Sequence, residues 1–233
     1  MSKHTDNKGN VRMIDISDKD ITKRVAKAEG YIELSEEALD TIVNNVNKKG
    51  DVLLTSDAQI VSSADKIVLP GVGSFNDCLN GIKSNKDLFF CLSDRVLKQG
   101  VPFLGICVGL QLLADYGHEN VKNTQGLGWI SGDVTRIIPK DVTIKIPHMG
   151  WNSMIFDREH LLTKNLTKDD DMYFVHSYHF QLQDIENRLA YVDYSDKLTA
   201  IVARGNICGT QFHPEKSQKA GQIFIENFLN WSP

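Results

Sequence analysis

The sequence predicts an α/β protein in which an open, mostly parallel sheet is flanked by helices. Short apolar runs at 66–69 and 101–106 alternate with helical stretches, which is typical of strands buried on both faces. Each run leads directly into a glycine-containing segment, where a strand can turn sharply. With 233 residues, the chain is also long enough to bury a sizeable core in one large domain.

The first 55 residues are charged and poor in core residues, so we expect 1–55 to be an atypical N-terminal segment and 56–233 the main domain. The expected elements of the segment are a strand at 13–16, a helix at 36–47 with Ser35 as its N-cap, and a strand at 51–55. We expect the helix and the strand at 51–55 to pack on the main domain and 1–30 to be loosely attached.

The main domain is expected to alternate between strands and helices first and to be richer in strands later. The expected helices cover a stretch that ends near Gly100, then 108–116 and 216–229. The expected strands, besides 66–69 and 101–106, are 134–138, 172–178, 189–193, 199–203 and 207–212.

Composition excludes several classes of protein. A net charge of -4 gives no basic excess with which to bind nucleic acid. No apolar run approaches membrane-spanning length, and the first ten residues lack the apolar region of a secretory signal. The four cysteines lie far apart without a C-x-x-C pair, which favours a reducing cytoplasm over a disulfide framework or a zinc site.

Cys107 is the first candidate for chemistry. It follows an apolar strand, it is flanked by Gly105 and Gly109, and a helix is expected to follow. This is the arrangement of a nucleophile elbow, in which the helix N-terminus favours a thiolate and backbone N–H groups can stabilise an oxyanion. A lone cysteine is more often a small buried hydrophobe, and that interpretation holds for the other three, Cys78, Cys91 and Cys208.

His213 and Glu215 form the second candidate, directly after an expected strand. Residues two apart on an extended segment face the same way, so the carboxylate can orient the ring and stabilise its charged form. In open α/β sheets the carboxyl ends of the strands gather at one edge, which brings this pair toward Cys107. The three residues would then form a triad for acyl transfer.

The segment 70–74 also follows an apolar strand, and its Gly71 and Gly73 let backbone N–H groups turn toward an oxyanion. An ordinary tight turn is the alternative for this segment taken alone. It lacks the complete glycine patterns of phosphate-binding loops, so a nucleotide site is not expected.

These segments resemble the class I glutamine amidotransferases, whose catalytic residues lie in G-x-C-x-G-x-Q and H-P-E motifs; here those motifs are 105–111 and 213–215. Further blocks are similar to the glutaminase subunit of imidazole glycerol phosphate synthase: 70–75, 147–152, 174–178 and 213–218. The resemblance covers about 56–233, with the blocks in the order and spacing of that family.

The resemblance implies a glutaminase with Cys107, His213 and Glu215 as its catalytic triad and no metal or organic cofactor. It implies a glutamine pocket lined by Gly71, Val72, Gly73, Gln111, Ser177 and Tyr178. It also implies a heterodimer with a separate (β/α)8 cyclase subunit, which would receive the ammonia and make imidazole glycerol phosphate and an aminoimidazole ribonucleotide in histidine biosynthesis. The interface would include Pro147, His148, Met149, Gly150, Trp151 and Asn152.

Residues 9–53 instead resemble the beginning of cyclic pyranopterin monophosphate synthase, on the blocks 9–17, 26–30 and 49–52. The later active-site segments of that family are absent, so its activity is not expected. Two alternatives to the main interpretation stay open. One is another Cys-His hydrolase of the same fold, such as a γ-glutamyl hydrolase. The other is an inactive or weakly active partner-binding remnant, because the first strand and turn of the amidotransferase are replaced.

Overall fold

The computed structural model describes residues 52–119, 123–141 and 143–233, all of which belong to one compact unit of the chain. Its main feature is a six-stranded sheet. In spatial order the strands are β1 (Ile67–Gly71), β2 (Phe103–Cys107), β12 (Ile207–Thr210), β11 (Lys197–Arg204), β10 (Arg188–Asp193) and β7 (Ile155–Phe156).

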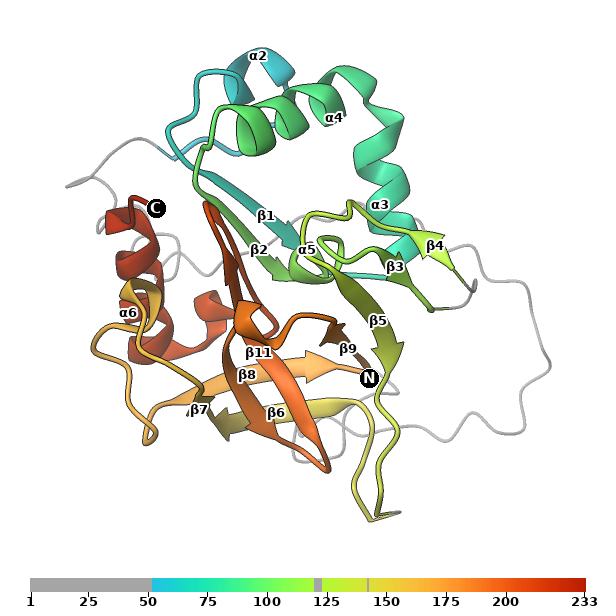
Figure 1. Cartoon of the computed structure of the whole chain (residues 1–233), viewed down its shortest axis with the longest axis vertical. Coiled ribbons are helices and arrows are strands. Elements are labelled where there is room, and N and C mark those ends of the chain that lie inside the picture. The colour runs from blue at the N-terminus through green and yellow to red at the C-terminus, as the bar shows by residue number, and fades with distance from the viewer. Residues whose placement is uncertain (1–51, 120–122, 142) are drawn as a thin grey trace, which may run out of the picture. The chain divides into compact units, whose positions relative to one another are not determined.

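The six-stranded sheet is mixed. β2 pairs in parallel with β1 on one side and with β12 on the other, and the remaining pairs are antiparallel. Figure 1 shows β1 and β2 side by side with their arrowheads at the same edge. The carboxyl ends of β1, β2 and β12 therefore meet at one edge, and each leads into a segment that the sequence singled out.

Two smaller sheets lie beside the main one. One has the order β4 (Thr124–Gln125), β3 (Tyr116–Gly117), β5 (Gly132–Arg136) and β9 (Tyr178–Leu182). The other is the antiparallel pair of β6 (His148–Ser153) and β8 (Asp171–His176). Ser177 alone separates β8 from β9, so the chain passes from one small sheet to the other at this residue.

The helical segments connect and cover these strands. They are α2 (Ala58–Val61), α3 (Phe75–Ser84), α4 (Lys86–Ser93), the π-helical turn η1 (Asp94–Lys98), α5 (Val108–Gln111), α6 (Gln218–Asn230) and the 3-10 turns η2 (Leu161–Thr163), η3 (Ile185–Asn187) and η4 (Pro214–Lys216). Figure 1 shows α2 beside α4, and α6 covers the segments around η2 and η4. None of the helices in the described part of the chain is both long and apolar enough to cross a membrane.

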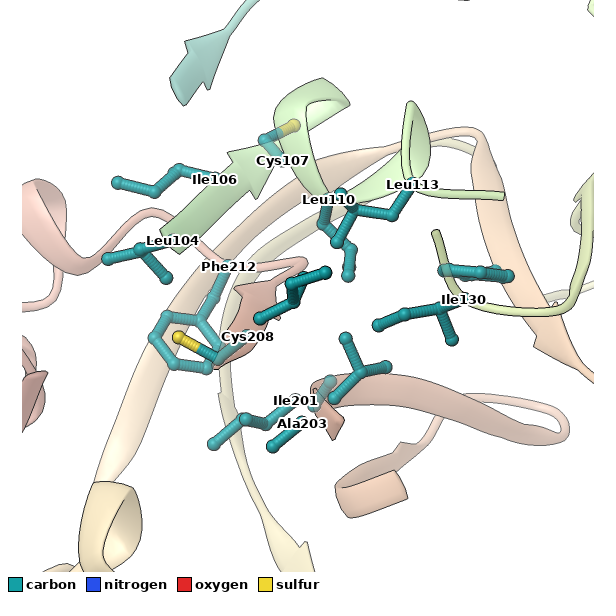
Figure 2. Close-up of a cluster of buried hydrophobic side chains, with 14 of the residues drawn as sticks. Leu104, Ile106, Cys107, Leu110, Leu113, Ile130, Ile201, Ala203, Cys208 and Phe212 are labelled. Carbon is teal, nitrogen blue, oxygen red and sulfur yellow. The ribbon is translucent and has the colours of Figure 1, made fainter. Parts of the chain in front are cut away.

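The core is one continuous apolar cluster around β2, β11 and β12. All five residues of β2 and all four of β12 are buried, because each of these strands has a neighbour on both sides. Figure 2 shows Cys208 of β12 among apolar side chains, whereas Cys107 lies at the edge of the cluster where β2 ends. The prediction that Cys208 is a buried structural cysteine agrees with its complete burial.

The expected α/β architecture with an open sheet and flanking helices is present, but the sheet is mixed rather than mostly parallel, because β11, β10 and β7 pair antiparallel. Most expected strands of the main domain are present within a few residues. One helix is much shorter than expected: the prediction was 108–116, but α5 ends at Gln111. The carbonyls of Leu112 and Leu113 accept hydrogen bonds from the amides of Leu127 and Trp129 instead of continuing the helix. A returning loop thus ends α5 after about one turn, which local helical spacing cannot reveal.

The expected strand at 51–55 is wrong for the residues that the structure describes. Residues 52–57 are irregular, and the exposed fractions of Val52, Leu53 and Leu54 are 58%, 68% and 97%. An apolar run followed by a polar turn is typical of a buried strand, but no strand in the described part of the chain pairs with this segment. The expected strand 172–178 is in fact two strands that part at Ser177, and the strand β6 was not expected.

Three expectations for the N-terminal segment lie outside the described residues: the strand at 13–16, the helix at 36–47 and the loose attachment of 1–30. The pyranopterin-synthase-like blocks at 9–17 and 26–30 and all but one residue of the block at 49–52 lie there as well. These expectations stay predictions.

Candidate active site

Cys107 is the last residue of β2 and the N-cap of α5, so the chain changes from strand to helix at this position. Its backbone angles are φ 54° and ψ −108°. A positive φ is uncommon for a residue other than glycine and is found where the surrounding structure holds a side chain in a strained orientation. The expected elbow is therefore present. Since α5 is only four residues long, however, its dipole offers the thiolate less than the predicted longer helix would.

The two glycines beside Cys107 are needed because backbone segments approach each other closely there. A Cβ atom on Gly109 would lie 1.9 Å from the carbonyl oxygen of Leu69 in β1. A Cβ atom on Gly105 would lie 2.5 Å from the carbonyl oxygen of Gly109. Only glycine allows α5 to pack this tightly against β1 and β2, and this packing fixes the elbow next to the end of β1.

His213 lies three residues beyond the end of β12, next to Cys107 at the end of the neighbouring strand. The parallel register pairs Thr210 of β12 with Ile106 of β2, which brings the two chain segments out at the same edge. The backbone amide of His213 donates to the carbonyl of Tyr173 in β8 over 3.0 Å and so fixes the start of η4. The His213 ring is hydrogen-bonded to Glu215, and its pKa is also raised by its interaction with the side chain of Cys107.

The His213–Glu215 contact is short and joins two groups of opposite charge. Nδ1 of His213 lies 2.7 Å from Oε1 of Glu215, and the histidine side chain is almost fully buried. Burial by itself lowers the pKa of His213, but the hydrogen bonds and charges of Cys107 and Glu215 outweigh it and raise that pKa to about 9. Burial likewise raises the pKa of Glu215, whereas the hydrogen bond and charge of His213 bring it below its usual value. At neutral pH the histidine is therefore cationic beside a carboxylate.

The residues predicted to line a glutamine pocket gather around this edge from three directions. Gly71 is directly opposite Cys107 in the β1–β2 register, and the loop that follows it leaves Val72 exposed. Gln111 is buried at the end of α5 and donates through Nε2 to the carbonyl of Tyr178 over 3.1 Å. The half-buried Ser177 and Tyr178 stand at the junction of β8 and β9. Gly73 follows in the same loop as Gly71, with a positive φ of 130°.

Gln211 is a polar residue of this site that the sequence reasoning missed. Its side chain is fully buried, and its Nε2 donates to Sγ of Cys107 over 3.7 Å. Its Oε1 accepts a hydrogen bond from Gln111 over 3.0 Å. The sequence held a usable signal, because Gln211 precedes His213 by two residues and so faces the same way on an extended segment.

The segment predicted to contact a partner, Pro147 to Asn152, coincides with β6 apart from its first residue. Its side chains alternate between two environments, as expected for a strand at the surface. Met149 and Trp151 are exposed to 66% and 47%, whereas His148 is buried with an exposed fraction of 2%. Gly150 has a positive φ of 135° and lies between the two exposed side chains. Large apolar side chains therefore cluster on the outer face of β6, and a polar ring lies on its inner face.

The comparisons with known proteins agree with this geometry. Residues 33–231 match the family described as glutamine amidotransferase class-I, so the chain belongs to the class I glutamine amidotransferases and is an enzyme of the glutaminase type. Two solved structures share the fold: a crystal structure of glutamine amidotransferase with a TM-score of 0.60, and the structure of PurLQS from Thermotoga maritima with a TM-score of 0.57. They are 15% and 17% identical in sequence, over 83% and 82% of this chain and 92% and 91% of theirs, respectively.

More similar relatives define the family within this class. The imidazole glycerol phosphate synthase subunit HisH of Ruegeria pomeroyi is 43% identical over 213 residues, which are 91% of this chain and all of that protein. HisH of Rhodospirillum rubrum is 45% identical over 88% of this chain and 95% of its own length. The chain therefore belongs to the HisH family. The class I match begins at residue 33, ahead of the predicted boundary between 55 and 56, which stays a prediction.

Proposed function

We propose that the chain is the glutaminase subunit of an imidazole glycerol phosphate synthase and that Cys107, His213 and Glu215 are its catalytic triad. The observation that supports this most directly is the position of Cys107 at a strained elbow, where it interacts with a histidine that Glu215 helps to hold in its charged form. A cation next to the sulfur favours the thiolate, which is the nucleophilic form of cysteine. Membership of the HisH family supplies the reaction class.

In the proposed reaction, Sγ of Cys107 attacks the carbonyl carbon of the glutamine side-chain amide. The C–N bond then breaks, the proton on His213 passes to the leaving nitrogen, and ammonia departs while a thioester forms. His213 next removes a proton from water, whose oxygen attacks the thioester. The C–S bond breaks, so that glutamate leaves and the thiolate returns. Glu215 keeps the ring oriented in both half-reactions through the 2.7 Å contact.

Two backbone segments are placed to stabilise the tetrahedral oxyanion in this proposal. The first is the start of α5 at Val108, directly after the nucleophile. The second is the end of β1 at Gly71, which is opposite Cys107 in the sheet register, together with Val72 and Gly73 in the loop that follows. Gln111, Ser177 and Tyr178 would complete the glutamine pocket. They approach from the other side of the elbow, through the hydrogen bond of Gln111 to the Tyr178 carbonyl.

The partner in this proposal is a (β/α)8 cyclase subunit that docks over residues 147–152, as an assembly in the cytoplasm. Ammonia released at Cys107 would pass to that subunit and be used to form imidazole glycerol phosphate in histidine biosynthesis. The exposed Met149 and Trp151 support this face as the docking surface, because large apolar and aromatic side chains are enriched at the centres of interfaces.

Replacement of the nucleophile tests the triad. Cys107→Ala and Cys107→Ser should each abolish the release of glutamate and ammonia from glutamine, measured with and without the cyclase subunit. Cys91→Ala is the matched control, since Cys91 lies in α4, away from the site, and should keep the activity. Normal turnover by Cys107→Ala would contradict the triad. A wild-type chain that binds the cyclase subunit but never hydrolyses glutamine would favour the alternative of a partner-binding remnant.

A binding measurement tests the docking surface. Trp151→Ala should weaken the affinity for the cyclase subunit by about tenfold or more, as truncation of a central aromatic anchor typically does. Phe90→Ala is the control, because Phe90 is also a large exposed aromatic, with an exposed fraction of 66%, but belongs to α4. Equal affinity of both variants and the wild type would remove β6 from the interface.

A further inference from the structure

We propose that Gln211 positions the thiolate of Cys107 and is the last link of a buried hydrogen-bonded chain that begins on β6. The inference rests on the proposed role of Cys107 as the nucleophile. It assigns a function to polar side chains that the triad mechanism does not use, and it connects the reacting sulfur to the strand whose outer face is the proposed docking surface.

The inner half of the chain joins Cys107 to the carbonyl of Tyr178. Nε2 of Gln211 donates to Sγ of Cys107 over 3.7 Å, and Oε1 of the same amide accepts from Nε2 of Gln111 over 3.0 Å. The second hydrogen of the Gln111 amide is donated to the carbonyl of Tyr178 over 3.1 Å. Gln211 is fully buried and Gln111 nearly so, so water cannot readily replace these bonds.

The outer half of the chain joins the same carbonyl to β6. Nδ1 of His176 lies 2.8 Å from the Tyr178 carbonyl oxygen, and Nε2 of His176 lies 3.0 Å from Nδ1 of His148. Asn152, also on β6, approaches the remaining ring nitrogen of His148 to 3.4 Å through its side-chain nitrogen. The register of β6 and β8 pairs His148 directly with His176, which explains why the two rings meet.

The backbone carbonyl of Tyr178 determines where the hydrogens lie along this hydrogen-bonded chain. The Tyr178 carbonyl can only accept, so Nδ1 of His176 bears the hydrogen. Burial holds the pKa of His176 at about 3 and that of His148 at about 4, so both rings are neutral at pH 7. Nε2 of His176 must then accept from Nδ1–H of His148, whose own Nε2 accepts from Asn152. Every donor in this half points inward, toward the Tyr178 carbonyl.

The same logic fixes the inner half. Because the Tyr178 carbonyl accepts from Gln111, the atom that faces it is the Gln111 nitrogen, and Gln211 must present its oxygen to that nitrogen. The Gln211 nitrogen is thereby turned toward Cys107. A rotated Gln211 amide would place two nitrogens against each other and an oxygen against the sulfur. The chain therefore holds an N–H donor on the thiolate in one orientation.

The side chains of β6 alternate between the inside and the outside of the protein, and this connects the hydrogen-bonded chain to the proposed docking surface. His148 and Asn152 face inward with the chain, whereas Met149 and Trp151 face outward on the same strand. The His148 ring is also stacked between Phe174 at 4.8 Å and Tyr194 at 4.0 Å, measured between ring centres. A shift of β6 relative to β8 would consequently move a ring that is bonded, through four further links, to the nucleophile.

The first test uses the full chain with two Gln211 variants and two readouts. Gln211→Met keeps the volume and removes both hydrogen bonds, and Gln211→Glu keeps the acceptor for Gln111 but removes the donor to sulfur. Each should lower kcat for glutamine about 10- to 100-fold, with the KM changed by less than about threefold, because the lost contact is to the nucleophile rather than to the substrate. Each should also shift the pH profile of Cys107 alkylation by iodoacetamide to higher pH.

Thr210→Val is the matched control. Thr210 lies next to Gln211, is equally buried, and its hydroxyl donates to the Phe212 carbonyl without joining the chain. It should leave kcat and the alkylation profile within about twofold of the wild type, whatever it does to the melting temperature. A wild-type kcat and alkylation profile in both Gln211 variants would overturn the proposal.

A double variant tests whether the hydrogen-bonded chain acts as one unit. His148→Phe keeps a ring between Phe174 and Tyr194 and removes both nitrogens, and it should lower kcat about 3- to 10-fold with a smaller shift of the alkylation profile in the same direction. If the chain is one unit, the variant with both His148→Phe and Gln211→Met is no worse than Gln211→Met alone. If the double variant instead lowers kcat by the product of the two single effects, the connection to β6 would be overturned. The alkylation readout does not depend on turnover, so failure of the Cys107 assignment is recognised separately, by full activity of Cys107→Ala.

Discussion

The buried histidines at the two ends of this site differ in charge although they are buried to nearly the same degree. His213 is exposed to 3% and His148 and His176 to 2% and 6%. Yet the pKa of His213 is raised to about 9, whereas those of His148 and His176 fall to about 4 and 3. Burial lowers the pKa of all three rings, so burial does not explain the difference.

The difference lies in what each ring contacts. His213 stands between a carboxylate and a cysteine sulfur, both of which favour the cation. His148 and His176 contact each other, an asparagine amide and a backbone carbonyl, and none of these bears a negative charge. The same residue type is therefore held in its charged form at one end of the site and in its neutral form at the other.

Removal of the Glu215 carboxylate should abolish the difference in histidine pKa between the two ends of the site. Glu215→Gln keeps a hydrogen-bonding group beside His213 but removes the charge, so the pKa of His213 should fall from about 9 and glutaminase activity should drop about 100-fold or more. NMR titration of the His213 ring and steady-state kinetics measure the two effects. Glu186→Gln is the control, since Glu186 forms only an exposed 3.8 Å pair with Arg158.

Glu215→Gln should also change the way in which the stability of the protein depends on pH. A raised pKa in the folded state stabilises the protein fully below about pH 6.5, the usual histidine value, and this contribution is lost as the pH rises through about 9. In Glu215→Gln the loss should occur at lower pH than in the wild type. An unchanged pKa of His213 in this variant would show that Cys107 alone keeps the ring charged.

The effect of His148→Phe on stability should depend on pH in the opposite sense to that of Glu215→Gln. The lowered pKa of His148 means that its contribution to stability is present above about pH 6.5 and is lost as the pH falls through about 4. The variant lacks this titration. Its deficit in the free energy of unfolding, measured against the wild type by urea unfolding, should therefore shrink as the pH is lowered from 6.5 to 4. The expected change is on the order of 3 kcal/mol. A deficit that stays constant over this range would contradict a neutral His148.

Sequence reasoning found the charged end of the site. For the neutral end, the resemblance named residues such as Gln111, Tyr178 and His148 in other roles, but the chain of hydrogen bonds that joins them was not predicted. The elbow at Cys107 and the His213–Glu215 pair are local features, in which neighbouring residues are enough to indicate the chemistry. The parallel order of β2 and β12 then brings them together, as expected for carboxyl ends of neighbouring strands.

The neutral chain could not be predicted because it depends on contacts between distant segments. His148 and His176 have no recognisable spacing in the sequence, and they meet only because β6 pairs with β8 in one register. The same holds for the short α5, because the loop around Leu127 binds the carbonyls of Leu112 and Leu113, with which the helix would have continued. The exposed Val52 shows the reverse error, in which a strand-like pattern has no neighbouring strand among the described residues to cover it.

His179 is a fourth buried histidine and is not hydrogen-bonded to either end of the site. Its Nε2 lies 3.5 Å from the hydroxyl of Thr135, directly opposite it across β5 and β9, and its buried Nδ1 has no hydrogen-bond partner among the described residues. Burial lowers its pKa, and the charge of Asp196 opposes this only partly. A buried polar atom without a partner costs stability, so an apolar side chain should be tolerated here.

His179→Leu should therefore have the smallest effect of the three substitutions. The free energy of unfolding at pH 7 should stay within about 1 kcal/mol of the wild type, or rise slightly, because the lost contact to Thr135 is long and one unpaired nitrogen disappears. Glutaminase activity should stay within about twofold, since the hydrogen bond of the ring is to Thr135 and not to Cys107 or the chain from β6. Urea unfolding and steady-state kinetics check both statements. A tenfold loss of kcat in a stably folded His179→Leu would mean that this ring has a partner in the reaction, and that the division into one charged and one neutral end is incomplete.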